Sequence, residues 1–215
     1  RSKAYCYETL LATWQGFVIG QGKAVELAGR KVVLGDHTVA VKDGRKMPGV
    51  VSLHEASETQ SKPDYFRGQC WGAIGLLVGS FSACFCCPLQ LQIQQGWQHL
   101  GLTEDSGEKN PVKLAERLVI MAILFAVSHN CPCYLVLDAF FSVGSVFRVC
   151  QYYSIEHKKP WVEILVKAKS HYVGYFPAPP KQASRPGPQP FYGEKVHLQE
   201  CFDHPHLFET AECNV

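Results

Sequence analysis

Hydrophobic residues recur along the chain in two rhythms, one typical of helices and one typical of strands. Helical spacing occurs in three segments, and we expect helices over 5–18, 111–128 and 144–153. Short runs rich in β-branched residues predict strands over 31–34, 38–41, 133–137 and 161–168. Pro111 supports the second helix, because proline fits the first turn of a helix. The pattern therefore predicts a protein of the α/β class.

The longest hydrophobic stretch, residues 70–89, has two interpretations. It is long enough to cross a bilayer as a helix, which needs about 20 apolar residues. Glycines, serines and Pro88 interrupt it, however, and Gln90–Gln94 alternates between polar and apolar residues. Two buried strands joined near Gly79 explain this composition better. We expect strands here and no membrane partner, with membrane insertion as the weaker alternative.

The order of the elements predicts how the sheet is built. Strands that turn back on themselves come first, with a hairpin turn expected at 36–38 or 43–44. Strands joined through helices follow, and such crossovers make neighbouring strands parallel. The polar segment 45–66 predicts a long loop. We expect an α/β fold with a mixed sheet flanked by helices.

Composition divides the chain into parts. It has 215 residues, 47% of them hydrophobic, so it can bury a core and wholesale disorder is excluded. Prolines concentrate at and beyond Pro177, where we expect a linker rather than core. The expected parts are a helical lead-in over 1–28, a core over 29–175, and a Pro-rich linker with the beginning of a further subdomain over 176–215. Neither end carries the signature of a terminus, and we expect the chain to be part of a longer one.

Charge and cysteine content narrow the classes of function. A net charge of +2 gives no general attraction to nucleic acid, so DNA binding has to rest on local clusters. The chain has 10 cysteines, several of them in apolar runs, and no export signal opens it, which favours a reduced, cytoplasmic location. The close sets Cys84–Cys87 and Cys131–Cys133 are spaced more tightly than the ligands of zinc ribbons, and a zinc site stays a minor alternative.

Two aspartates follow hydrophobic strands in the same way. Asp36 comes after 31–34, and Asp138 comes after 134–137. If these strands are parallel neighbours, their carboxyl ends meet at one edge of the sheet, where α/β proteins bind ligands. Carboxylates held together there repel each other unless a cation lies between them, and Mg²⁺ prefers oxygen ligands. The alternative is that each aspartate only caps the following turn.

The residues around both aspartates resemble a known family, the bacterial insertion-sequence transposases of the Asp-Asp-Glu class. The second catalytic block of that family is similar to Leu135–Ser142. The first block is longer and is similar to Leu34–Asp36, Gly44–Val50, Leu53–His54, Ser61–Pro63, Tyr65, Gly68 and Trp71–Ala73. The resemblance extends over about residues 29–174, and the first block is the more specific of the two.

The resemblance implies an RNase H-like fold, with a mixed five-stranded sheet flanked by helices. It implies metal-dependent cleavage and joining of DNA strands with Mg²⁺, for which Mn²⁺ can substitute. Asp36 and Asp138 match the two aspartate positions of the family, and would be both catalytic and metal-binding. The implied partner is DNA, at the element ends and the target, and a homodimer is left open. The implied location is the bacterial cytoplasm, at the nucleoid.

The chain departs from the family pattern at three places. His37 follows the first aspartate where a small residue is expected, and Gln69 follows Gly68 where histidine is commoner. The third carboxylate of the family is not identified, since the late glutamates precede its expected place and lie in no convincing helix; they are Glu194, Glu200, Glu209 and Glu212. We therefore expect an incomplete site, and the rival hypothesis is a truncated, non-catalytic remnant that binds DNA or a partner.

Basic side chains supply the candidate DNA contacts. They occur in the predicted loop after the first strands and again before the last one. The candidates are Arg45, Lys46, His54, Lys62, Lys158 and Lys159. Such groups attract the phosphate backbone of DNA. A solvated surface role is the alternative for each of them.

Overall fold

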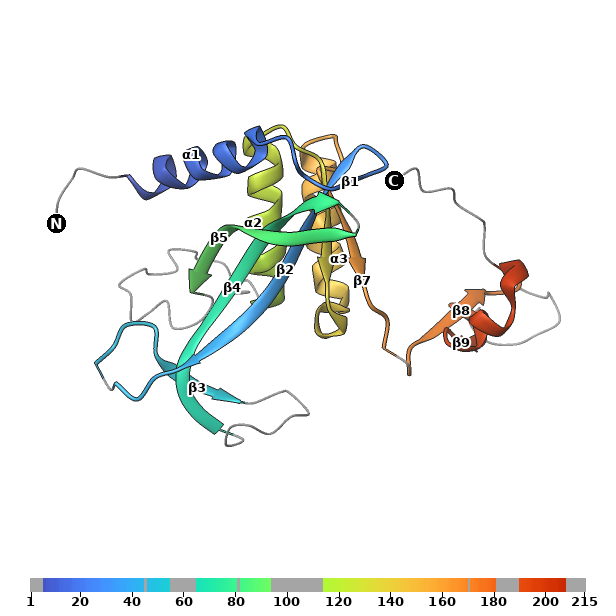
Figure 1. Cartoon of the computed structure of the whole chain (residues 1–215). Helices are drawn as coiled ribbons and strands as arrows, with labels where there is room; N and C mark the ends of the chain where they lie inside the picture. Colours follow the sequence, from blue (N-terminus) through green and yellow to red (C-terminus); the bar gives the residue numbers. More distant parts are fainter. Residues whose placement is uncertain are drawn as a thin grey trace. The chain divides into compact units, whose positions relative to one another are not determined.

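The computed structural model describes residues 6–44, 46–54, 65–80, 82–93, 114–169, 171–180 and 190–207 (Figure 1). The described residues up to Val166 form one compact unit, and those from Lys167 onward form a second. The first unit contains both aspartates and the sheet that carries them.

The sheet of the first unit has seven strands among the described residues. They are β1 (Glu26–Leu27), β2 (Arg30–Val41), β3 (Val51–His54), β4 (Tyr65–Ser80), β5 (Ala83–Ile93), β6 (Cys133–Leu137) and β7 (Val162–Val166). The five longest follow one another as neighbours in the order β5-β4-β2-β6-β7. The pairs β5–β4 and β4–β2 are antiparallel, and the pairs β2–β6 and β6–β7 are parallel. The sheet is therefore mixed, and the change of pairing occurs at β2.

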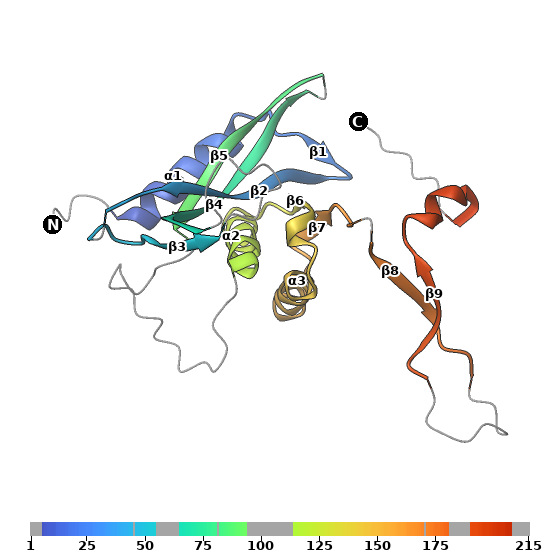
Figure 2. The ribbon, with the colours of Figure 1, turned by 90° about the horizontal axis from the view of Figure 1, so that it is seen from below.

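In the described part of the first unit, three α-helices accompany this sheet: α1 (Tyr7–Gly20), α2 (Leu114–Ser128) and α3 (Gly144–Glu156). The helices α2 and α3 pack against each other and lie on one side of the strands (Figure 2). Helix α1 packs on β5, where the Trp14 indole N–H donates a 2.8 Å hydrogen bond to the Pro88 carbonyl. One face of the sheet is thus covered by α2 and α3.

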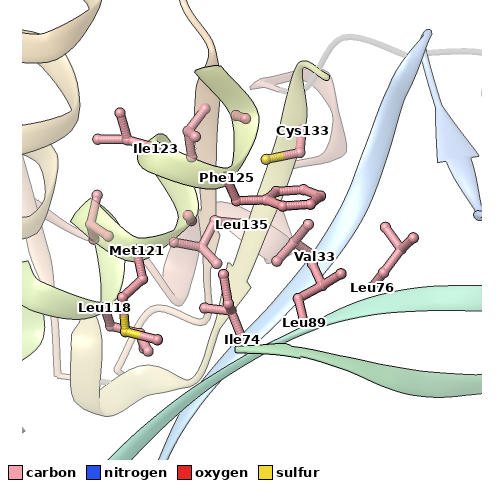
Figure 3. Close-up of a cluster of buried hydrophobic side chains, with 14 of the residues drawn as sticks. Val33, Ile74, Leu76, Leu89, Leu118, Met121, Ile123, Phe125, Cys133 and Leu135 are labelled. Atoms are coloured by element: carbon pink, nitrogen blue, oxygen red, sulfur yellow. The ribbon is translucent and has the colours of Figure 1, made fainter. Parts of the chain in front are cut away.

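The hydrophobic core lies between α2 and the covered face of the sheet (Figure 3). Residues two apart on a strand share a face, and the buried residues of β6 alternate in this way. Val33 of β2, Leu76 of β4 and Leu135 of β6 are fully buried there. From the helix side, Leu118 and Phe125 of α2 pack against them. Full burial of such side chains contributes about 1.5–3 kcal/mol each.

Most elements agree with the sequence predictions. The helices predicted over 5–18, 111–128 and 144–153 match α1, α2 and α3, although 111–113 lies outside the described residues. The strand predicted over 133–137 is β6, residue for residue. The apolar run 70–89 forms two paired strands joined just after Gly79, as predicted. In the described part of the chain, no helix is long and apolar enough to span a membrane.

Three details of the prediction are wrong. The hairpin expected at 36–38 does not form, because β2 runs unbroken from Arg30 to Val41 and pairs with β4 along most of its length. The segment predicted as a loop over 45–66 contains β3 and the first residues of β4. The sheet has seven strands among the described residues rather than five, because the short strands β1 and β3 add to the five long ones.

The second unit is built on a two-stranded antiparallel sheet of β8 (Val173–Pro177) and β9 (Tyr192–His197). Two short 3₁₀ turns, η3 (Glu200–Asp203) and η4 (Pro205–Leu207), follow it. The rings of Tyr175 and Tyr192 lie 5.0 Å apart between centroids and tie the two strands together.

Candidate functional site

The register of two parallel strands brings the two aspartates side by side. In the ladder between β2 and β6, Lys31 is opposite Cys133 and Leu34 is opposite Val136. Two residues further along each chain stand Asp36 and Asp138. Neighbouring strands lie about 4.8 Å apart, so the two backbones at these positions are close. The predicted juxtaposition is therefore present, although Asp36 lies within a strand and not at its end.

Both aspartates lie on the face of the sheet opposite α2. A methyl group placed on Gly35 would meet Leu118 of α2 at 3.1 Å and Leu137 at 2.8 Å, so position 35 faces the covered side. Successive strand residues alternate between faces, which turns Asp36 to the other side. Asp138 follows the buried Leu137 in the same way, and both aspartates are exposed. The pair is therefore open to solvent and to a ligand.

Backbone N–H groups orient both carboxylates. The N–H of His37 donates to Asp36 Oδ1 at 2.7 Å, and the N–H of Phe140 donates to Asp138 Oδ1 at 2.8 Å. Asp138 is thereby the N-cap of a short 3₁₀ turn, η2 (Ala139–Phe141). The capping role weighed as the alternative for Asp138 is thus real, and it uses only one oxygen. A carboxylate has two oxygens, so each keeps acceptor capacity.

The pair fits a hard divalent cation in its chemistry. Mg²⁺ takes oxygen ligands, keeps several waters, and is commonly held by only one or two carboxylates together with substrate phosphates. Asp36 and Asp138 would supply the two carboxylates. Among the described residues, no three side chains of histidine, cysteine, aspartate or glutamate gather closely enough to hold a metal ion. If a cation binds here, the described part of the chain would therefore supply two ligands.

His37 lies behind the pair, on the covered face. Its ring lies 5.0 Å from the ring of the fully buried Phe141, centroid to centroid. Burial lowers the pKa of the His37 imidazole, while the carboxylates of Asp36 and Asp138 act in the opposite direction. Both carboxylates are thus close enough to interact electrostatically with this ring. Sequence reasoning noted His37 only as a departure from a family pattern, and did not find Phe141.

Of the other predicted residues, His54, Lys158 and Lys159 lie away from the aspartates. Arg45 and Lys62 are outside the described residues. Lys46 is exposed in the turn that follows β2. His54 ends β3 and packs its ring edge-on against Tyr65 at 5.0 Å. Tyr65 is eight positions along β4 from the partner of Asp36, or roughly 25 Å at strand spacing, so His54 does not join the pair.

Lys158 and Lys159 lie at the other end of the parallel strands, where β6 and β7 begin. They follow α3, which returns the chain from the end of β6 to the beginning of β7. The Lys159 ammonium lies 3.8 Å from the centre of the Trp161 ring, and the Trp161 carbonyl accepts from the N–H of Cys133, the first residue of β6. Asp138 lies five residues further along, about 16 Å away at strand spacing.

The buried cysteines do not extend the site. Burial raises the pKa of Cys133 to about 12 and that of Cys70 to about 11. Metal ligation and nucleophilic attack both require the thiolate, which burial disfavours here. These thiols act as small hydrophobic core residues.

The candidate site thus consists of one carboxylate on β2, a second directly after the neighbouring parallel strand β6, a capped turn, and an aromatic pair behind them. No family model matches the chain, and no curated protein or solved structure matches it significantly.

Proposed function

We propose that the chain is the catalytic-core portion of a DNA transposase of the Asp-Asp-Glu class, acting by metal-dependent phosphodiester cleavage and strand transfer. The observation that carries the proposal is the register of β2 against β6, which places Asp36 of β2 beside Asp138, the residue that directly follows β6. Carboxylates at adjacent positions of parallel strands, exposed on one face, are what a cation-dependent phosphodiester site requires.

The arrangement of the long strands supports an RNase H-like core as part of this proposal. The path β5-β4-β2-β6-β7 is a five-stranded mixed sheet flanked by helices, which is the form implied by the family resemblance. The two short strands β1 and β3 are additions at the margins of this path.

The residues of the chain have limited tasks in such a reaction. A bound divalent cation supplies activation of the attacking water and stabilisation of the leaving oxygen. Asp36 and Asp138 would be the residues that hold that cation. The N–H groups of His37 and Phe140 keep the carboxylates turned, so little reorganisation accompanies binding.

A non-catalytic remnant that binds DNA or a partner is the second candidate function. It is favoured by one observation: the described residues bring two carboxylates to the site and no third metal-binding side chain. Under this candidate, DNA binding would depend on basic groups such as Lys46 and would not need metal.

Calorimetric titration with Mn²⁺ and Mg²⁺ tests the proposal. We expect the wild-type chain to bind metal, and Asp36→Asn and Asp138→Asn each to weaken binding by at least about tenfold, as loss of a charged ligand implies. Without metal, each substitution is expected to raise the thermal midpoint, because it removes repulsion between neighbouring carboxylates. With metal present, we expect the wild-type chain to have a higher thermal midpoint than either variant.

Asp43→Asn is the matched control, since Asp43 is an exposed aspartate just after the same strand. It should change neither metal binding nor the response of the midpoint to metal. Absence of metal binding in the wild type, with DNA binding retained, would overturn the catalytic proposal in favour of the remnant. Equal effects of all three substitutions would show that the pair is not a site.

A further inference from the structure

The ring of His37 links the strand of one aspartate to the turn of the other. His37 follows Asp36 on β2, and its backbone N–H holds the Asp36 carboxylate at 2.7 Å. Its ring lies on the covered face of the sheet. The centroid of this ring is 5.0 Å from the centroid of the Phe141 ring, and the two ring planes are tilted by 53°. Phe141 is the last residue of η2, the turn that Asp138 caps. One residue thus contacts both halves of the site.

The turn is held to Asp138 by backbone hydrogen bonds and to the core by Phe141. The Phe140 N–H donates to the Asp138 carboxylate at 2.8 Å, and the Phe141 N–H donates to the Asp138 carbonyl at 3.2 Å. The Phe140 and Phe141 rings meet edge to face at 5.2 Å, and Phe141 is 1% exposed while Phe140 is 51% exposed. Phe141 is therefore the anchor of the turn, and His37 is an aromatic neighbour of that anchor.

The His37 imidazole contacts Phe141 by packing and not by hydrogen bonding. Both ring nitrogens of His37 are buried and have no hydrogen-bond partner among the residues that the structure describes. The ring is also on the face opposite the carboxylate of Asp36, and it forms no metal-binding group with the two aspartates. A polar ring without partners costs free energy, so an apolar ring of similar size should serve as well or better.

We propose that His37 is a positioning residue, whose ring packs on Phe141, holds η2 against β2, and so sets the separation of the Asp36 and Asp138 carboxylates. The consequence for metal binding rests on the proposed function. The consequence for the turn does not, because it concerns only the packing of His37, Phe141 and Asp138.

The test compares His37→Ala with His37→Phe by two measurements. The first is hydrogen exchange of the Phe140 amide by NMR, which reports on the cap at Asp138. We expect about tenfold faster exchange in His37→Ala, the factor expected from losing an aromatic pair, and wild-type exchange in His37→Phe. The second is Mn²⁺ affinity, which should weaken roughly tenfold in His37→Ala, as loss of outer support for a ligand does, and stay unchanged in His37→Phe.

Val162→Ala is the control for general destabilisation, since Val162 is buried at the beginning of β7, at the other end of the strands from Asp138. It should lower the thermal midpoint and leave both readouts at wild-type values. If His37→Ala leaves the Phe140 amide protected, or if His37→Phe exchanges as fast as His37→Ala, the positioning role is refuted. If the wild type binds no Mn²⁺, the proposed function fails, and the exchange measurement still decides the role of His37.

Discussion

The side chain of His129 joins helix α1 to the end of helix α2, and its protonation should affect the stability of the fold. One ring nitrogen, Nε2, shares a 3.0 Å hydrogen bond with the Gln15 side chain of α1, and the ring packs on Phe125 of α2 at 5.4 Å. Gln15 is 4% exposed, so it depends on this partner. Burial lowers the pKa of His129 below its usual value of 6.5. The unfolded chain therefore takes up a proton at higher pH than the folded chain does.

Stability should consequently be complete above pH 6.5 and fall as the pH drops below this value. We expect the thermal midpoint to decline from about pH 7 to pH 5.5, and His129→Gln to make the decline shallower. Part of the slope should persist, because burial shifts the pKa of His37 in the same direction. Thermal unfolding followed by circular dichroism measures this. An unchanged slope in His129→Gln would exclude His129 as a coupling group.

At the scale of elements, the hairpin of β1 and β2 carries a strained residue. Leu27 pairs with Arg30, and the two residues between them have positive φ, 48° for Ala28 and 73° for Gly29. Two positive values are typical of a type I′ turn, which favours glycine or asparagine at both places. Alanine has a Cβ atom that opposes this conformation.

Ala28→Gly should therefore stabilise the protein, by roughly 1 kcal/mol in the free energy of unfolding, since it removes the left-handed penalty of alanine. Gly29→Ala is the matched opposite change and should destabilise by a similar amount. Urea unfolding at constant pH measures both. The turn assignment is refuted if the two substitutions shift the midpoint in the same direction.

The strands also differ in how well they could be predicted from the sequence. Strand β6 was predictable because an unbroken apolar run bounded by Pro132 and Asp138 has few alternatives. Strand β2 was predicted as two pieces, since Gly35-Asp36-His37 favours a turn locally; pairing with β4 and β6 on its two sides overrides that preference. The neighbourhood of Asp36 and Asp138 could be predicted, whereas the contact of His37 with Phe141 could not, because it required an unbroken β2.

At the scale of the whole molecule, the described hydrophobic core belongs to one unit. All buried hydrophobic residues of the described chain lie between Val18 and Val162. The second unit contributes a two-stranded sheet and short turns, with exposed rings such as Phe191 and Phe202. A two-stranded sheet alone is marginally stable in water.

A chain shortened to residues 1–168 should accordingly fold, with a thermal midpoint within about 4 °C of the full chain, a shift that corresponds to roughly 1–2 kcal/mol at most. A peptide of residues 167–215 should show no cooperative unfolding. Circular dichroism melts of the three chains measure this. A shortened chain that fails to unfold cooperatively would mean that the second unit is required for the core.

The alternation of β2 also has a consequence for errors of folding. Val33 points into the core, while Asp36 points to the open face. If β2 slipped by one residue against β6, Val33 would be expelled and Asp36 would be driven into a hydrophobic interior. The shift that destroys the site thus also destroys the core. Misfolded copies should be unstable and open to degradation, so a population of well-folded molecules with a displaced aspartate pair cannot arise by this route.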